Sequence, residues 1–522
     1  MGQFIDIGNK LFKDILRSDF VDKTGVINLL NRSIDTENRF VCVSRPRRFG
    51  KTIAANMIYA YYDRTADAKE LFDNLEISKS KDYETFLNKY PTIYIDLNYF
   101  SYIDKNIVVR EFQKVVIADL KQLYPDLTET EYLMPALSEI NKRTGDRFVL
   151  LIDEWDSWIR DVDKSIQEEY LNFLRSLFKS NNAKDIFSLV YMTGILPIIK
   201  YETQSALNNF REYSVLDPGP TAKYYGFTKE EVKSLCEKNG MNFQLMEHAY
   251  DGYIIGDERS MFNPTSVMLS ILYGNYKNRW GKSASYATIE RYIKIDTDNV
   301  RKKIVKMLEG KSVYVQVTSF RNDMKHIENC DDVLTLLAHL GYLSYDPETS
   351  QVRIPNTEVS EEFKNSIRIC GWGGLSKALG QSHDLLMATI NGDQEFVAQA
   401  MEEYHREATS FIEYNDENSL ACAIMIAYYS AKSYYEIFRE FPTGKGYADM
   451  VFLPLPTTPF PAIVVELKYD KSAYGAIAQI KDKKYPARLK KFSKQIVLAG
   501  INYDKVSKTH EVEIETVDGE GM

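Results

Sequence analysis

Short runs of apolar residues alternate with amphipathic segments through residues 1–222 of the chain. The runs are rich in β-branched residues, a pattern typical of strands that are buried on both faces of a parallel sheet. Because the segments between them have the character of amphipathic helices, this part of the sequence predicts an α/β domain. The predicted strands are RFVCVS (39–44), TIYIDLNY (92–99), RFVLLIDE (147–154), FSLVYMTGI (187–195) and YSVLD (213–217).

The pattern changes beyond residue 225. From GFTKEEVKSLCEKNG (226–240) to ILYGNY (271–276) it predicts helices broken by turns at DGY and NPTS, with no buried strands. In the region 285–360, VRKKIVKMLEG and DDVLTLLAHLGYL are predicted helices, and LSYDPETSQVRIP is typical of a β-hairpin. Helices followed by such a hairpin favour a winged helix-turn-helix.

A second α/β unit is predicted after the glycine-containing stretch GWGGLSKALGQS (371–382). It opens with predicted helices at 386–405 and 408–431. Antiparallel strands are expected next, at SYYEIFREF (433–441) and GYADMVFLP (446–454). The remaining predicted elements are, in order, the strand AIVVELK, a helix, and the strands QIVLAGINY and HEVEIETV.

The composition is that of a soluble globular protein, with 44% apolar and 27% charged residues. At 522 residues the chain is too long for one hydrophobic core, so several domains are expected. A net charge of −9 argues against a protein that coats DNA with its whole surface, but it is compatible with a local basic groove. The five cysteines are scattered without a CxxC pair, which indicates neither a zinc site nor a disulfide framework.

The sequence signals neither secretion nor a membrane anchor. The N-terminal stretch MGQFIDIGNKLFKDIL carries acidic residues where a signal peptide needs a basic flank. The uncharged run from Ser419 up to Lys432 is shorter than the roughly 20 apolar residues that cross a bilayer. We therefore expect a soluble, cytoplasmic protein.

The segment RPRRFGKT (45–52) follows the first predicted strand and opens the predicted helix KTIAANMIYAYYD. A phosphate-binding loop occupies this position, with backbone N–H groups and a helix N-terminus facing the phosphates. Lys51 would reach the β- and γ-phosphates and Thr52 would hold Mg²⁺. The motif GxxxxGK[ST] has its first glycine where this chain has Arg45, so the loop alone also fits an ordinary strand-to-helix turn. The predicted nucleotide-binding residues of the loop are Arg47, Arg48, Phe49, Gly50, Lys51 and Thr52.

An acidic pair strengthens the nucleotide hypothesis, since Asp153 and Glu154 end the apolar run RFVLLIDE. Phosphoryl transfer needs a carboxylate on Mg²⁺ and a second group that acts as base or positions water. Asp153 fits the first role and Glu154 the second. Thr193 lies near the end of the next predicted strand, where it would sense the γ-phosphate. Arg211 would complete a site in a neighbouring subunit or sense nucleotide, although a surface role is the simpler account.

The strand AIVVELK runs an apolar sequence straight into Glu466 and Lys468. Residues two apart on a strand point to one face, so these two side chains lie side by side. Asp449 is a lone acid in the preceding strand, and it would share one metal ion with Glu466 if the strands are neighbours. Two carboxylates and a lysine suit Mg²⁺-assisted phosphodiester hydrolysis. Glu417 would add a carboxylate from the preceding helix, and Gln479 an amide from the following one.

Two features of this region have ordinary explanations when taken alone. Glu-x-Lys also occurs at Glu231–Lys233, Glu309–Lys311 and Glu362–Lys364, so the tripeptide itself proves little. From Lys468 to Lys494 there are nine Lys or Arg and two acids, which fits either a solvated helix face or contact with a phosphate backbone. Beside the D…ExK pattern, phosphate contact is the preferred interpretation.

Both halves of the chain resemble known families. VDKTGVINLL (21–30), SRPRRFGKT, LLIDEWD, TGILPI and FNPTSVM are similar to motifs of the AAA-ATPase-like family, in which an arginine-rich, glycine-poor loop is usual. ENSL, PTGKGYADMVF, VVELKYD, AIAQI and KKYP are similar to motifs of PD-(D/E)XK nuclease superfamily members that are fused to it. The resemblance implies an ATPase core (1–222), a helical lid (223–284), a winged-helix-like region (285–370) and a restriction-endonuclease-like domain (383–522).

The resemblance also implies site residues and cofactors. The implied nuclease residues are Glu417, Asp449, Glu466, Lys468 and Gln479, and the implied ATPase residues are Gly50, Lys51, Thr52, Asp153 and Glu154. The implied cofactors are ATP and Mg²⁺, with Mn²⁺ as an alternative because oxygen ligands suit both ions. Proteins of this kind are largely bacterial.

The leading hypothesis is an ATP-regulated, Mg²⁺-dependent nuclease in which the nucleotide state controls access to Asp449, Glu466 and Lys468. DNA is the preferred substrate, RNA stays open, and defence against foreign DNA is an analogy drawn from the domain pairing. The alternative is an ATP-dependent switch or regulator whose nuclease-like domain and winged helix bind nucleic acid or a partner without cleaving. A homo-oligomer is expected because cutting both strands needs two nuclease sites.

Overall fold

The computed structural model describes most of the chain, namely residues 3–5, 7–160, 162–198, 200–201, 204–205, 207–280, 286–294, 297–318, 320–322, 327, 329–408, 417–442, 447–456, 458–483, 485, 489 and 492–518. The chain forms two compact units. The N-terminal unit comprises Met1–Met246, Tyr250–Asn275 and Val313–Pro355, and the C-terminal unit comprises Glu247–Ala249, Tyr276–Ser312 and Asn356–Met522. Two boundaries, after Ser312 and after Pro355, fall inside the predicted winged-helix-like region (285–370), and the four-domain division stays a prediction.

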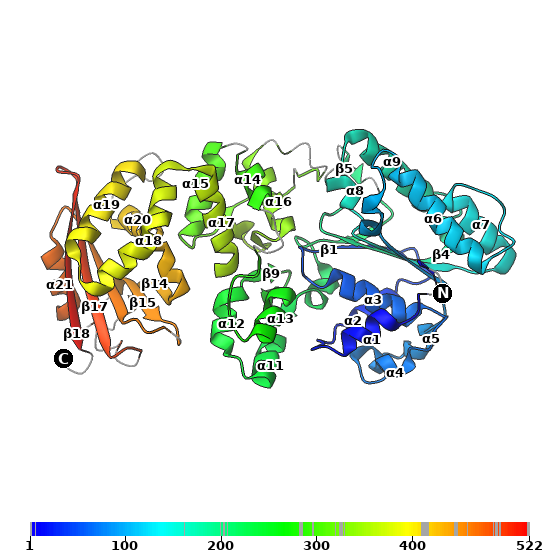
Figure 1. The fold of residues 1–522 in the computed structure, drawn as a ribbon, viewed down its shortest axis with the longest axis horizontal. Coiled ribbons are helices and arrows are strands. Elements are labelled where there is room, and N and C mark those ends of the chain that lie inside the picture. The colour runs from blue at the N-terminus through cyan, green and yellow to red at the C-terminus, as the bar shows by residue number, and fades with distance from the viewer. Residues whose placement is uncertain are drawn as a thin grey trace. The chain divides into compact units, whose positions relative to one another are not determined.

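A five-stranded sheet in the order β2-β3-β4-β1-β7 forms the core of the N-terminal unit (Figure 1). All neighbouring strands are parallel, which confirms the predicted fold class. The strands are β1 (Phe40–Ser44), β2 (Thr92–Asp96), β3 (Phe148–Asp153), β4 (Phe187–Gly194) and β7 (Arg211–Tyr213). A separate short hairpin pairs β5 (Lys200–Tyr201) with β6 (Gln204–Ser205).

The fifth predicted strand, YSVLD (213–217), is misplaced. The structure has a strand at Arg211–Tyr213 instead, so only Tyr213 is shared. The chain turns directly afterwards, because the Ser214 hydroxyl accepts the N–H groups of Leu216 and Asp217, each at 3.2 Å. Such local side-chain bonds compete with a sheet ladder.

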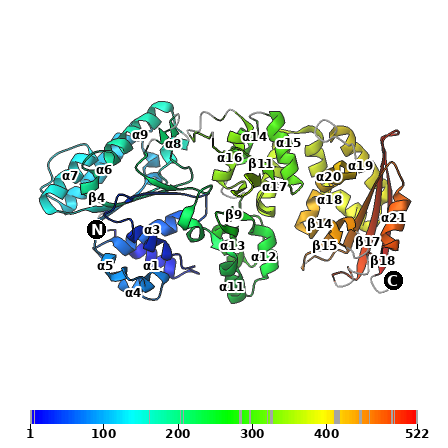
Figure 2. The ribbon, with the colours of Figure 1, turned by 180° about the vertical axis from the view of Figure 1, so that it is seen from behind.

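Helices cover both faces of the parallel sheet, as Figures 1 and 2 show from opposite sides. Cys42 of β1 faces one core and its neighbours Val41 and Val43 face the other, which follows the two-residue period of a strand. One face packs against α6 (Val108–Leu123), α7 (Leu133–Thr144) and α9 (Lys164–Phe178), and the other against α1 (Lys10–Leu16), α2 (Gly25–Asn31) and α3 (Lys51–Tyr62). The short helices are α4 (Lys69–Phe72), α5 (Tyr83–Phe86), α8 (Ser157–Arg160) and α10 (Ala183–Ile186).

The prediction that residues 226–276 contain no buried strand is wrong. Three antiparallel strands lie there in the order β8-β10-β9, and every residue of β9 is buried. Strands this short give too little alternation to detect, and the DGY turn leads into β9 instead of a helix. The strands are β8 (Phe227–Thr228), β9 (Tyr253–Ile255) and β10 (Glu258–Phe262), with helices α11 (Lys229–Asn239), α12 (Phe243–Tyr250) and α13 (Pro264–Tyr273).

The helices and hairpin on which the winged-helix prediction depends are present. The helices are α15 (Thr297–Leu308) and α16 (Cys330–Leu340), and the hairpin joins β12 (Ser344–Asp346) to β13 (Gln351–Arg353), with β11 (Val313–Tyr314) pairing on its other side. However, α15 belongs to the C-terminal unit, whereas α16 and the hairpin belong to the N-terminal unit. The winged-helix interpretation therefore stays a prediction.

A five-stranded mixed sheet in the order β14-β15-β16-β17-β18 lies in the C-terminal unit. Only the β16–β17 pair is parallel, and the two strands predicted at 433–441 and 446–454 are antiparallel neighbours as expected. Helix α21 (Ala473–Asp482) packs on one face of the sheet. Helices α18 (Gly373–Asn391), α19 (Gln394–Ala408) and α20 (Glu417–Ala427) pack on the other face (Figures 1 and 2). The strands are β14 (Tyr435–Pro442), β15 (Tyr447–Pro454), β16 (Ala462–Tyr469), β17 (Gln495–Asp504) and β18 (Thr509–Asp518).

The helices predicted at 386–405 and 408–431 have different bounds in the structure. Helix α18 begins at Gly373, inside the glycine-containing stretch, and ends at Asn391. It stops there because Gly392 adopts a left-handed conformation with φ of 78°. The other helices of this unit are α14 (Tyr286–Ile293), α17 (Thr357–Cys370), α19 (Gln394–Ala408) and α20 (Glu417–Ala427). Within the described residues, none of the helices is long and apolar enough to cross a membrane.

Candidate functional sites

The predicted phosphate-binding loop joins the buried end of β1 to α3. Arg48 and Gly50 both adopt left-handed conformations, with φ of 71° and 84°, and this turns the chain sharply into the helix. Gly50 is the N-cap of α3, and its carbonyl accepts the N–H of Ala54 at 2.9 Å. The loop thus presents a helix N-terminus at the carboxyl edge of the parallel sheet, where anions bind well.

Arg45, at the position of the usual first glycine, is fully buried and braces the loop. Its guanidinium donates to the carbonyls of Ser44 (2.8 Å) and Tyr213 (3.0 Å) and to Oγ1 of Thr221 (2.8 Å). It also lies 5.3 Å from the centre of the Tyr225 ring, and burial lowers the pKa of Arg45 to about 10. The departure from the glycine-rich motif therefore has a structural reason.

Restoring the usual motif with Arg45→Gly is expected to weaken the protein. The substitution leaves buried acceptors without a donor and opens a cavity, which together cost about 2–4 kcal/mol of unfolding free energy. Urea unfolding of the full chain measures this effect, with Arg47→Gly, an exposed neighbour on the same loop, as the control. Unchanged stability of Arg45→Gly would contradict the bracing role.

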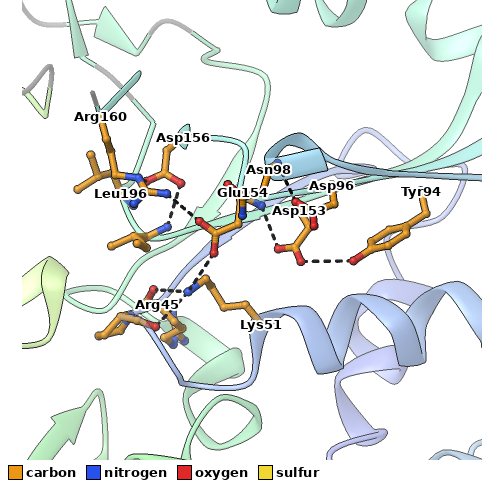
Figure 3. A network of polar contacts seen from close by, with 12 residues as sticks. Arg45, Lys51, Tyr94, Asp96, Asn98, Asp153, Glu154, Asp156, Arg160 and Leu196 are labelled. Atoms are coloured by element: carbon orange, nitrogen blue, oxygen red, sulfur yellow. Dashed lines mark hydrogen bonds and ion pairs between the residues drawn. The ribbon is translucent and has the colours of Figure 1, made fainter. Parts of the chain in front are cut away.

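Lys51, Glu154 and Arg160 form a charged network beside the loop (Figure 3). Lys51 Nζ donates to the carbonyls of Arg45 (3.2 Å) and Pro46 (3.1 Å) and lies 3.9 Å from Glu154 Oε1. Burial lowers the pKa of Lys51, an effect that the carboxylates of Glu154 and Asp153 oppose. Glu154 Oε2 also pairs with Arg160 Nη2 at 2.8 Å, so the carboxylate lies between two cations.

Asp153 ends β3 in register with Asp96 of β2 and Thr193 of β4, and its side chain is buried. The Tyr94 hydroxyl donates to Asp153 Oδ2 at 3.3 Å (Figure 3), and the Thr52 side chain hydrogen-bonds to the same carboxyl group. Burial raises the pKa of Asp153 to about 6. The structure thus brings together the two oxygen donors, from Thr52 and Asp153, that were predicted to hold Mg²⁺.

A polar cavity of about 560 Å³ opens over the loop. Its cationic lining residues are Arg47, Arg48, Lys51 and Arg160, against the single carboxylate of Glu154, and the remaining lining residues are Gly50, Thr52, Ile53, Asn98, Ser157 and Thr265. This excess of positive charge suits a polyphosphate.

Four predicted nucleotide-site residues do not line the polar cavity, and the buried Asp153 described above is one of them. Phe49 is buried and packs edge-on against Tyr253 at 5.1 Å. Thr193 is buried beside Asp153 and accepts the N–H of Trp155 at its carbonyl. Arg211 is exposed on the edge strand β7, opposite Val41, which agrees with the surface alternative.

A second, mostly apolar cavity of about 350 Å³ shares Gly50, Ile53 and Thr265 with the polar one. Its walls come from four distant segments of the chain and include Phe20, Val21, Phe49, Met57, Phe227, Met268 and Leu269. The sequence did not predict this cavity, because no local pattern brings those segments together.

The sequence also missed polar-cavity residues, of which Arg160 is the most prominent. Arg160 lies on the short helix α8 directly after the acidic pair, so its proximity to Glu154 was the available signal. Asn98 lies just beyond β2, and Thr265 lies in the first turn of α13, where Asn263 caps the helix. These residues follow a strand end or a helix start, positions that often face a ligand in α/β folds.

In the C-terminal unit, Asp449 of β15 and Glu466 of β16 meet as predicted. The pairing of Met450 with Val465 places the two acids next to each other at the end of the ladder. Asp449 Oδ2 accepts the N–H of Leu467 at 2.7 Å. Burial and the charge of Asp449 raise the pKa of Glu466, whose side chain is only 2% exposed. Two adjacent carboxylates of this kind favour a bound cation.

Lys468 and Gln479 both contact Glu466. Lys468 Nζ lies 3.0 Å from Glu466 Oε1, and the Gln479 amide donates to the same oxygen. The other oxygen, Oε2, is buried and accepts no hydrogen bond from any residue that the structure describes. An unpartnered buried carboxylate oxygen beside a second acid fits a divalent metal ion.

Other residues predicted for this site are only partly described. Glu417 begins α20, which packs against β16, but its side chain lies outside the described part. Within that part, no group of three or more His, Cys, Asp or Glu gathers at a metal-binding distance. Of the predicted basic patch, Lys484, Arg488, Lys490 and Lys491 lie outside the described residues. A hydrogen bond with Tyr485 and the charges of Glu466 and Asp449 raise the pKa of Lys483.

The parallel sheet, the loop and its cavity define a P-loop NTPase-like core in the N-terminal unit. Family models agree: residues 6–203 match the predicted AAA-ATPase family, and residues 415–513 match the PD-(D/E)XK nuclease superfamily. The chain thus combines a predicted AAA-ATPase domain with a C-terminal PD-(D/E)XK nuclease superfamily domain. Domains of these two kinds generally use a nucleotide and a divalent metal ion.

Several solved structures are similar at low identity. The Walker-type ATPase of Pyrococcus abyssi is 11% identical over 66% of this chain and 94% of its own, with a TM-score of 0.34. The ORC2 protein of Aeropyrum pernix is 9% identical over 66% and 92%, with a TM-score of 0.31. AMPPCP-bound DnaA from Aquifex aeolicus is 10% identical over 68% and 82%, with a TM-score of 0.25. No curated protein matches the chain.

Proposed function

We propose that the N-terminal unit binds and hydrolyses ATP. The observation that carries this proposal is the polar cavity over the loop, with four cations in its lining and with Thr52, another lining residue, hydrogen-bonded to the buried Asp153. The triphosphate would lie in this cavity, and the purine in the adjoining apolar cavity. The shared residues Gly50, Ile53 and Thr265 mark where the ribose would pass between them.

The residues of the polar cavity divide into binding and activating groups. Lys51, now on the loop carbonyls, would turn to the β- and γ-phosphates, and the backbone of the loop would donate to them. Thr52 and Asp153 would hold Mg²⁺, which when bound neutralises phosphate charge. Glu154 would orient the attacking water and accept its proton.

The C-terminal domain is proposed to hydrolyse phosphodiesters. Asp449 and Glu466 would hold Mg²⁺ or Mn²⁺, which when bound makes water a better nucleophile and neutralises charge on the phosphate. Lys468 would stabilise the negative charge that develops on the phosphate, and Gln479 would position Glu466 or the water. DNA is the proposed substrate, since exposed lysines such as Lys471 and Lys494 suit its backbone.

Nucleotide binding is proposed to control cleavage, in a role such as defence against foreign DNA. The test is cleavage of plasmid DNA, single-stranded DNA and RNA by the full chain, with Mg²⁺ or Mn²⁺ and with or without ATP. Metal-dependent cutting that changes with ATP supports the proposal. Binding of ATP and nucleic acid without any cutting would establish the alternative, a nucleotide-dependent switch. Cutting of both plasmid strands in one event would favour a homo-oligomer.

The affinity of the protein for Mg²⁺-ATP is expected to decrease at acidic pH. A metal ligand must be deprotonated, and burial raises the pKa of Asp153 to about 6, so protons compete with the metal below that pH. Affinity for Mg²⁺-ATP should decrease up to about tenfold per pH unit as the pH falls from 6 to 5, and be flat above 7. Fluorescence titrations at each pH measure this, and Asp153→Asn should show no such step.

A further inference from the structure

Arg160 connects the two acids that follow Asp153 in the sequence motif. Its Nη2 lies 2.8 Å from Glu154 Oε2, and its Nε lies 3.0 Å from Asp156 Oδ2 (Figure 3). The side chain is 10% exposed, and it lines the polar cavity together with Lys51. Arg160 therefore has one contact in the interior and one at the wall of the cavity.

The interior contact is fixed by the surrounding backbone. Asp156 is fully buried and accepts the N–H groups of Ile195 (3.2 Å) and Leu196 (2.9 Å), directly beyond β4. Its carboxylate lies so close to Gly194 that a Cβ at that residue would overlap Oδ1. Asp156 thus has little freedom to move, and it holds the Nε side of the Arg160 guanidinium in place.

The contact at the cavity wall, by contrast, is open to competition. Glu154 offers one negative charge to two cations, since its Oε2 pairs with Arg160 and its Oε1 lies 3.9 Å from Lys51 Nζ. A γ-phosphate carries more charge than a carboxylate and offers several oxygens to a guanidinium fork. Bound in this cavity, it would draw both cations away from Glu154.

We propose that Arg160 is a γ-phosphate ligand supplied by the same chain, held on Glu154 when no triphosphate is bound. A triphosphate takes the Nη2 side of the guanidinium and leaves Glu154 free to accept a hydrogen bond from water. A diphosphate lacks the group that competes, so the Arg160–Glu154 pair persists. Arg160 then distinguishes ATP from ADP, an inference that rests on the proposed binding of ATP in the polar cavity.

The test compares the affinities of the full chain for Mg²⁺-ATP and Mg²⁺-ADP by fluorescence titration. Arg160→Gln keeps much of the length of the side chain and a polar amide near Asp156, but it removes the charge. ATP affinity is expected to fall about 10- to 100-fold, whereas ADP affinity changes by less than about twofold. Arg160→Lys should lie in between, because one ammonium group cannot replace the fork. Arg143→Gln, on the exposed end of α7, is the control.

Equal losses for both nucleotides, or no loss for either, would overturn the proposal and make Arg160 a purely structural brace. If Arg160→Gln does not fold, as judged by thermal melting, the ratio of ATP affinity to ADP affinity is compared between Arg160→Lys and the wild type instead. Arg160→Lys retains a cation for Asp156. Wild-type protein that binds neither nucleotide would refute the proposed function itself, an outcome distinct from wild-type binding with an unchanged ratio in the variants.

Discussion

Replacing Glu466 with glutamine should abolish phosphodiester cleavage while leaving the fold intact. Glu466 is the residue on which Asp449, Lys468 and Gln479 converge, and its Oε2 is the buried oxygen without a donor among the described residues. An amide cannot supply the charge that a divalent ion needs, so the cleavage rate should fall at least about 100-fold.

The thermal midpoint of Glu466→Gln is expected to be unchanged or higher. Burial already disfavours the charged carboxylate, as the raised pKa of Glu466 indicates, so the neutral amide is the easier group to bury. Glu513→Gln is the matched control, because Glu513 of β18 and Glu466 of β16 both pair with Gly500 of β17. Cleavage by Glu466→Gln at the wild-type rate would exclude the proposed nuclease site.

Lys51→Ala should separate the two activities. The substitution removes the cation nearest to the loop carbonyls, so ATP affinity is expected to fall about 10- to 100-fold. If nucleotide controls cleavage, the ATP concentration at which the cleavage rate of the variant changes should rise by the same factor of about 10 to 100. Cleavage assays with an ATP series measure this, with Lys142→Ala, an exposed lysine of α7, as the control. An unchanged ATP dependence of cleavage in Lys51→Ala would show that the nucleotide site that regulates cleavage lies elsewhere.

The parallel core and its loop could be predicted because their signals are local. A strand that is buried on both faces has an uninterrupted apolar sequence, as in FVLLID of β3, and its polar end marks the carboxyl edge of the sheet. The same reasoning placed Glu466 and Lys468 on one face of β16, since the two-residue period of a strand needs no tertiary information.

What the sequence could not predict depends on distant segments or on backbone irregularities. The apolar cavity needs residues from the N-terminal segment, α3, β8 and α13 to meet, and no spacing encodes that meeting. Arg160 reaches Glu154 across a short helix with non-helical dihedrals at Trp158, so a helical projection misplaces it. The brace role of Arg45 requires Tyr213 and Thr221, which lie far along the chain.

The interleaving of the two compact units has a consequence for how such a protein can be dissected or remodelled. The chain leaves the N-terminal unit at Asn275 and returns at Val313 before it finally departs after Pro355. A chain that stopped after Pro355 would contain α14 but would lack α17, the helix against which α14 packs. The C-terminal unit therefore cannot be removed by cutting the chain at one point, and gene fusion or loss between the two units would have to respect several crossing points at once.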